Sequence, residues 1–201
     1  MDESKSNHFD TDAANLRRAS FMAAISPELA AVEDALPQTI ATVNASTRSK
    51  LRKIYVVADD LSKAREPFVA CGQGCASCCH MNVSITSAEA ELLANASGRR
   101  AANVLRSPSR SADAFSGQPC TFLDGQSRCS VYADRPLACR KHASFFEDAG
   151  PCHPSVMNEL QVPQVTFSGL DQALFVVSGE RRNPILADIR DFFPPAENKR
   201  R

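Results

Sequence analysis

The chain has 201 residues, 43% of them hydrophobic, so it is long enough for one domain with a real core and too short for two large ones. Lysine plus arginine and aspartate plus glutamate number 23 each, so the formal net charge is zero and no overall field favours nucleic acid or an anionic membrane. No apolar run approaches the roughly 20 residues of a spanning helix, and the first residues do not resemble a secretory signal. We expect a cytoplasmic protein that binds neither nucleic acid nor a membrane.

Helices are predicted for a first segment, residues 1–67. Ser26, Pro27 and Glu28 form a helix start, with a serine N-cap, a proline at the first helical position and an acid in the first turn. Pro37 is expected to interrupt the helix. Beyond it an apolar stripe recurs at mostly three- and four-residue steps, through Ile40, Val43, Leu51, Ile54, Ala58 and Leu61. Packing onto the rest of the chain is the simpler use of this stripe, and a face for a protein partner is the alternative.

All eight cysteines lie between Cys71 and Cys152. In a reducing compartment thiols seldom persist as structural disulfides, so thiolate ligation of a metal is their expected use. Ordinary buried thiols are the alternative, but confinement to one part of the chain argues against it. The pattern is C-x3-C-x2-C-C followed by a more open set: Cys71, Cys75, Cys78 and Cys79, then Cys120, Cys129, Cys139 and Cys152.

The spacing within the first set indicates more than one metal atom. The two-residue gap from Cys75 to Cys78 lets both sulfurs reach one tetrahedral ion. Neighbouring side chains tend to diverge, so Cys78 and Cys79 are expected to serve two metals or two atoms of one cluster. The eight thiols therefore predict either one multinuclear site or two adjacent sites. With eight thiols available, each histidine beside a cysteine is expected to be a hydrogen-bond donor around the centre or an ordinary polar residue. His142, three residues after Cys139, is the best candidate among them for a further ligand.

Cations are expected around the thiolates, because four of them on one divalent ion leave a charge of about minus two. Arg128, Arg135, Arg140 and Lys141 lie beside Cys129 and Cys139 in the sequence. For Arg128 and Lys141 an ordinary surface position is the simpler interpretation.

The rest of the chain predicts little sheet. Residues 86–89 match a capping box that starts a helix, and short extended runs are expected at 81–85 and 162–165. Residues 184–193 resemble a short amphipathic helix. The predicted fold is mainly α: N-terminal helices, a small loop-rich cysteine-cluster domain at 68–160 organised around metal, and a C-terminal extension at 161–201.

At these residues the sequence resembles the YkgJ-like cysteine-cluster family of zinc- or iron-chelating domains. The matching pieces cover about residues 68–153: the C-x3-C-x2-C-C run, residues 119–123, residues 129–132 and residues 135–140. The resemblance implies that all eight cysteines are candidate metal ligands and that Tyr132 and Arg135 support the centre. Arg140, next to Cys139, is expected to bind the centre with them. It leaves the metal open between zinc and iron, with an iron–sulfur cluster included.

Three functions remain open on the sequence. The first is a metal-binding module. The second is an iron–sulfur-dependent enzyme, because the same cysteine pattern resembles the cluster region of flagellin lysine methylases; the chain has no glycine-rich loop of the kind that holds a nucleotide-like cofactor. The third is a thiol redox protein that uses Cys75 with Cys78 or Cys79.

Overall fold

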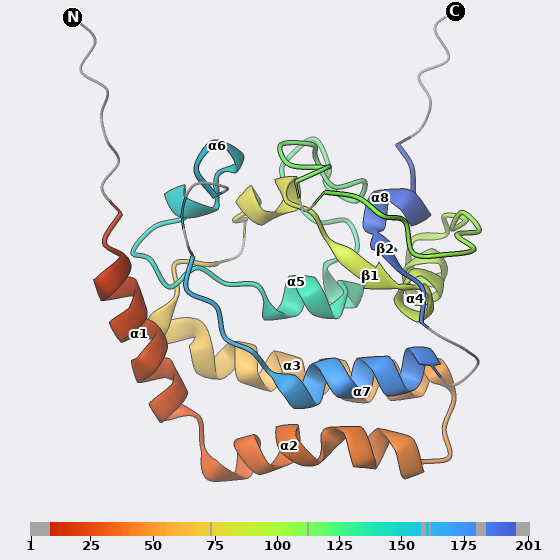
Figure 1. The fold of residues 1–201 in the computed structure, drawn as a ribbon, viewed down its shortest axis with the longest axis horizontal. Coiled ribbons are helices and arrows are strands. Elements are labelled where there is room, and N and C mark those ends of the chain that lie inside the picture. Colours follow the sequence, from red (N-terminus) through yellow and green to blue (C-terminus); the bar gives the residue numbers. More distant parts are fainter. Residues whose placement is uncertain are drawn as a thin grey trace, which may run out of the picture.

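A layer of long helices lies beneath a loop-rich region that carries the cysteines (Figure 1). The computed structural model describes residues 9–72, 74–111, 113–157, 160, 162–179 and 184–195. Within these ranges the chain forms eight α-helices, four 3-10 turns and two strands of three residues each. The prediction of a mainly α fold with few short strands is therefore confirmed.

Three N-terminal helices follow one another in the lower part of the molecule. They are α1 (Thr11–Ala24), α2 (Pro27–Thr42) and α3 (Thr47–Arg65), and a 3-10 turn, η1 (Glu66–Phe68), follows. Side chains of Asp10, Ser26 and Ser46 cap their first turns by accepting backbone hydrogen bonds. The helix start predicted at Ser26 is thus present.

Pro37 lies inside α2 instead of ending it, so the expected interruption was wrong. Proline has no N–H to donate to the carbonyl of residue 33, four positions earlier. On that side of α2, Gly169 of α7 (Ser168–Gly179) packs so closely that a Cβ atom on it would lie 2.0 Å from the Glu33 carbonyl oxygen. The Glu33 carboxylate also accepts a 2.8 Å hydrogen bond from the Leu170 amide. Contact with α7 therefore stabilises α2 at the point where Pro37 leaves out a backbone hydrogen bond.

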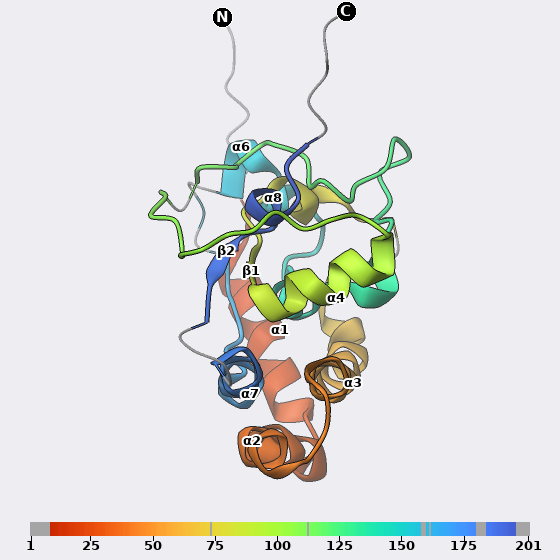
Figure 2. The same ribbon diagram turned by 90° about the vertical axis from the view of Figure 1, so that its right-hand side faces the viewer.

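Helix α7, from the C-terminal part of the chain, completes the helical layer. Seen end-on, α2, α3 and α7 form a triangle (Figure 2). The buried core there includes Phe21, Ile40, Leu51, Ile54 and Leu170. The residues of the apolar stripe predicted beyond Pro37 are divided between α2 and α3, and most of their side chains are buried.

The strands tie the C-terminal segment to the middle of the chain. Strand β1 (Ser84–Thr86) pairs antiparallel with β2 (Leu186–Asp188), in the register Ser84 with Asp188. The extended run expected at 81–85 is thus a strand only from Ser84, and 162–165 forms none. Because 186–188 pair with β1, the helix predicted at 184–193 is reduced to α8 (Ile189–Phe192).

The remaining elements are short and surround the cysteines. They are η2 (Ser77–His80), α4 (Ser87–Ser97), η3 (Tyr132–Asp134), α5 (Leu137–Lys141), η4 (Gly150–Cys152) and α6 (Pro154–Met157). The predicted capping box is present, since Thr86 and Glu89 each bond the other's backbone at the start of α4. None of the helices in the described part of the chain is long and apolar enough to cross a membrane.

The expected division at residues 67 and 160 remains a prediction. The C-terminal segment supplies α7 to the helical layer, and β2 and α8 to the cysteine region (Figure 1).

Candidate metal centre

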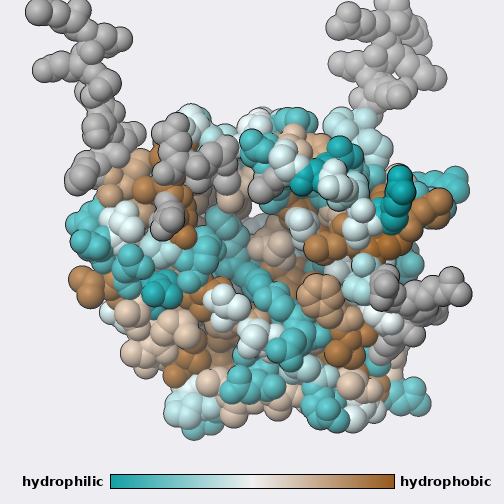
Figure 3. All heavy atoms as spheres, in the orientation of Figure 1, coloured by the Kyte–Doolittle hydropathy of each residue, from teal (hydrophilic) through white to brown (hydrophobic). Residues whose placement is uncertain are grey.

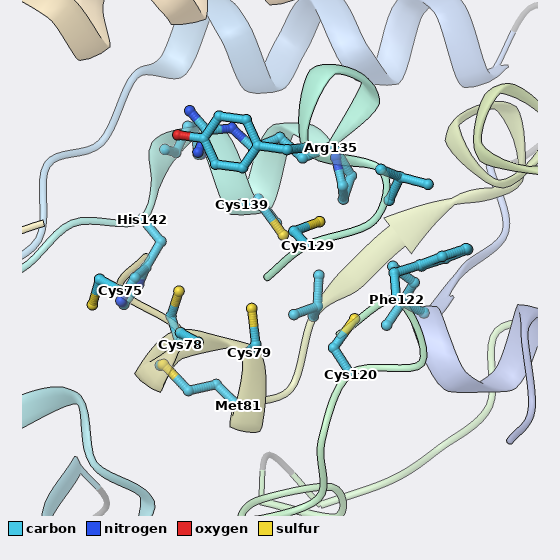
Figure 4. Close-up of a pocket in the computed structure, with 18 of the residues that line it drawn as sticks. Cys75, Cys78, Cys79, Met81, Cys120, Phe122, Cys129, Arg135, Cys139 and His142 are labelled. Carbon is cyan, nitrogen blue, oxygen red and sulfur yellow. The ribbon is translucent and has the colours of Figure 1, made fainter. Parts of the chain in front are cut away.

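Six cysteines line a cavity of about 880 Å³ above the helical layer. The face of the molecule in Figure 3 is hollowed near its centre. Figure 4 shows that the sulfurs of Cys78, Cys79, Cys120, Cys129 and Cys139 point toward a common space. Apolar side chains such as Val83, Val131 and Ile189 complete the walls. Segments far apart in the sequence thus bring their thiols together.

The first cysteine loop is a sequence of tight turns. The Cys75 amide bonds the Gly72 carbonyl at 3.1 Å, and the Cys79 amide bonds the Ala76 carbonyl at 2.9 Å. Gly74 has φ of 91°, a conformation that favours glycine. Cys78 and Cys79 influence each other's pKa, with the Cys78 thiol as donor and the Cys79 sulfur as acceptor. Their expected binding to two metals or to two atoms of one cluster stays a prediction.

Four thiols form one group: Cys79, Cys120, Cys129 and Cys139. All six pairs among them are close enough to interact electrostatically. The Cys120 amide bonds the Cys79 carbonyl at 2.7 Å, and Cys129 lies in a β-bridge with Leu123. Cys139 comes from α5.

A second group comprises Cys71, Cys75 and Cys152, whose three pairs also interact. His142 belongs to it, since its Nε2 lies 3.8 Å from the Cys152 sulfur. The Ser144 amide donates a 3.2 Å hydrogen bond to the Cys71 sulfur. Cys78 lies between the groups and interacts with Cys71 and Cys139. The spatial groups therefore mix the two sets of cysteines seen in the sequence.

Most of these thiols are protonated in the metal-free chain. Burial raises the pKa of Cys120 and of Cys152 to about 11, and it also raises the pKa of Cys71, Cys129 and Cys139. Cys79 differs, because the hydrogen bond from Cys78 lowers its pKa to about 7, with help from the nearby Arg190 guanidinium. Burial, together with Arg65, lowers the pKa of His142 and keeps its imidazole neutral, the form that binds metals.

Three arginines lie near the thiols, and only one of them was predicted. Arg135, next to Cys71 and Cys129, stacks on Tyr132 with 4.3 Å from guanidinium carbon to ring centre. Arg65 lies near Cys71, and Arg190 near Cys79 and Cys120. Arg190 was missed because it lies far from the cysteines in the sequence, within the short amphipathic helix predicted at 184–193.

Arg140 supports the centre only indirectly. Its guanidinium turns to α3, where it pairs with Asp59 and lies 4.3 Å from the Tyr55 ring centre. It also bonds the carbonyls of Ala133 and Arg135. Arg128 pairs with Asp124, and Lys141 with Asp171. Arg140 thus fixes the chain around α5 without facing the cavity.

Glu89 fixes α5 from the other side. Its buried carboxylate accepts hydrogen bonds from the Leu137 amide at 2.8 Å and the Tyr55 hydroxyl at 3.1 Å. Burial raises the pKa of this carboxyl. Leu137 is the first residue of α5, so Glu89 helps to place Cys139. Apart from the capping box, no sequence pattern pointed to this role of Glu89.

The donor set fits a thiophilic metal, although the thiols stand apart around the cavity. Within the described ranges, no three cysteine, histidine, aspartate or glutamate side chains are arranged to hold one ion. All eight cysteines are free thiols. Thiolates and imidazole, with guanidinium groups nearby, suit zinc or iron. Because the thiols stand apart, they would have to move inward to bind a metal.

Residues 70–161 match the family model CxxCxxCC, described as "Putative zinc- or iron-chelating domain". The cysteine-rich segment of the chain is similar to this family. The match confirms the YkgJ-like resemblance, and all eight cysteines fall inside the chelating-domain segment, as do Tyr132 and Arg135. Arg65 and Arg190 lie outside it. No curated protein and no solved structure matches the chain.

Proposed function

We propose that this protein binds zinc or iron through its eight cysteines, in two adjacent thiol groups. One is the four-thiol group, Cys79, Cys120, Cys129 and Cys139. The other is the histidine group, Cys71, Cys75 and Cys152 with His142. Cys78 joins them. The observation that carries the proposal is that all four cysteines of the four-thiol group, which come from three separate parts of the chain, line one cavity and point their sulfurs into it (Figure 4).

The chemistry of the site supports metal holding. A bound metal stabilises the folded chain, since the loops that carry the thiols have little regular structure of their own. Arg65, Arg135 and Arg190 offset the negative charge that several thiolates bring into a partly buried space. Tyr132 orients the Arg135 guanidinium by stacking.

The test is metal analysis of the protein purified without oxygen, combined with single substitutions in each group. We expect two metal equivalents in the wild type, loss of one in Cys139→Ser and loss of the other in Cys75→Ser. Met81→Leu, which changes a cavity side chain without removing a thiol, is the matched control and should keep both. A wild-type protein without zinc or iron would refute the proposal, whereas one cysteine substitution that empties every site would indicate a single multinuclear centre.

The volume of the cavity supports a second candidate function, that of an iron–sulfur-dependent enzyme. A closed four-thiolate structural site needs no space beside it, whereas about 880 Å³ could admit a substrate or cofactor. A brown chromophore with acid-labile sulfide would support this candidate. A colourless protein with two zinc ions would leave the binding module as the function.

A further inference from the structure

Arg190 lies outside the chelating-domain segment, yet its side chain is buried against that segment's cysteine loops. Only 2% of the side chain is exposed. It belongs to α8, which β2 holds against β1. The Ile189 amide bonds the Val83 carbonyl at 2.9 Å, and the Val83 amide bonds the Asp188 carboxylate at 2.7 Å. The backbone that carries Arg190 is therefore fixed.

The Arg190 guanidinium joins two separate segments of the cysteine region. On one side it donates to the carbonyls of Cys79, at 3.4 Å, and Met81, at 3.2 Å. On the other it donates to those of Gln118, at 2.5 Å, and Pro119, at 3.2 Å. The first segment carries Cys79 and the second ends at Cys120. Both belong to the four-thiol group.

No other side chain type can make this set of contacts. Arginine has five N–H donors in a rigid planar fork, whereas lysine has three on one nitrogen and glutamine two. The pairing of Arg190 with Asp188, at 3.0 Å, compensates the cost of burying the charge. The Cys79 carbonyl also accepts from the Cys120 amide, so the same oxygen links both cysteines to Arg190.

We propose that Arg190 is a positioning residue for the metal centre, which sets the spacing of Cys79 and Cys120 by bridging the carbonyls beside them. This inference rests on the proposed function. It makes the C-terminal segment part of the four-thiol site, although that segment contributes no thiol. The histidine group, Cys71, Cys75 and Cys152 with His142, has no contact with Arg190 among the interactions described.

The test compares Arg190→Gln with Arg99→Gln in the full chain. Arg99 is a matched control, because it also ties the C-terminal segment to the region after Cys120, through Thr121 and Pro194, and touches no cysteine. Zinc affinity is measured by competition with a chromophoric chelator. Cobalt(II) is the second probe, since its thiolate-to-metal absorption reports the geometry of the sulfurs around the ion. Circular dichroism follows folding independently.

We expect Arg190→Gln to weaken one of the two zinc equivalents by roughly 10- to 100-fold and to alter the cobalt absorption of that equivalent, with the other unchanged. Arg99→Gln should keep both. Wild-type affinities in Arg190→Gln, or the same loss in both variants, would overturn the proposal. If Arg190→Gln does not fold, Arg190→Lys is the deciding variant. Weaker binding of one zinc equivalent would support positioning by the guanidinium group, and wild-type affinity for both would overturn the proposal. A wild type that binds no metal would instead show that the proposed function has failed.

Discussion

The hydroxyl of Tyr55 on α3 donates a hydrogen bond to the buried carboxylate of Glu89 on α4, 3.1 Å away. The same carboxylate accepts from the backbone amides of Thr86 and Leu137. One side chain thus connects the helical layer, the end of β1 and the start of α5.

Glu89→Ala should therefore reduce the free energy of unfolding by about 3 kcal/mol, because it leaves buried donors without an acceptor. Glu91→Ala, on the exposed face of the same helix, is the control and should change it by less than about 0.5 kcal/mol. Urea unfolding followed by circular dichroism measures both. Equal stabilities of the two variants would contradict the role given to Glu89.

Gly169→Ala should destabilise the helical layer by about 2–3 kcal/mol. A Cβ atom there would lie 2.0 Å from the Glu33 carbonyl oxygen, so α2 and α7 must separate. Gly179→Ala, at the end of α7, would meet its nearest neighbour at 3.9 Å and should be tolerated. Thermal unfolding of both variants tests this, and a wild-type midpoint for Gly169→Ala would show that the helices do not pack so closely.

Metal removal should loosen the cysteine region and leave the helical layer folded. The core of that layer, with Phe21, Ile40 and Leu170, contains no cysteine. A chelator should therefore raise amide hydrogen exchange in residues 74–80 and 113–139, with little change in 27–42, 47–65 and 168–179. The double variant Cys75→Ser/Cys139→Ser is the control and should not respond. Uniform loss of protection would mean that the two regions unfold together.

Zinc affinity should rise with pH. Because the pKa of Cys120 and of Cys152 is raised to about 11, both thiols carry protons at pH 7 and must release them to bind. More than one proton leaves per ion, so the association constant should increase by at least about tenfold per pH unit from 6.5 to 8. Calorimetry in two buffers with different ionisation enthalpies counts the protons. A pH-independent constant would mean that the thiols are already ionised.

The features that the sequence predicted are local. Caps at Ser26 and Thr86 depend on residues within a turn, and the motif around Cys71 to Cys79 is contiguous. Pairing across the chain could not be predicted: no local pattern joins Ser84 to Asp188, or Cys152 to Cys71. The interruption predicted at Pro37 was wrong because the helix there is supported by contact with Gly169, more than a hundred residues away. Arg190 was missed for the same reason, since its partners are carbonyl groups, which every residue has.

The interaction between Cys78 and Cys79 also affects how the metal-free chain reacts with oxidants. The thiolate is the reactive form of cysteine, and Cys79, with a pKa of about 7, is ionised far more at neutral pH than Cys120 or Cys152. Peroxide, which converts a thiolate to sulfenic acid, should therefore react with the Cys78–Cys79 pair faster than with Cys120 or Cys152. Oxidation of an unloaded chain would thus begin at this pair and reach the four-thiol group, to which Cys79 belongs.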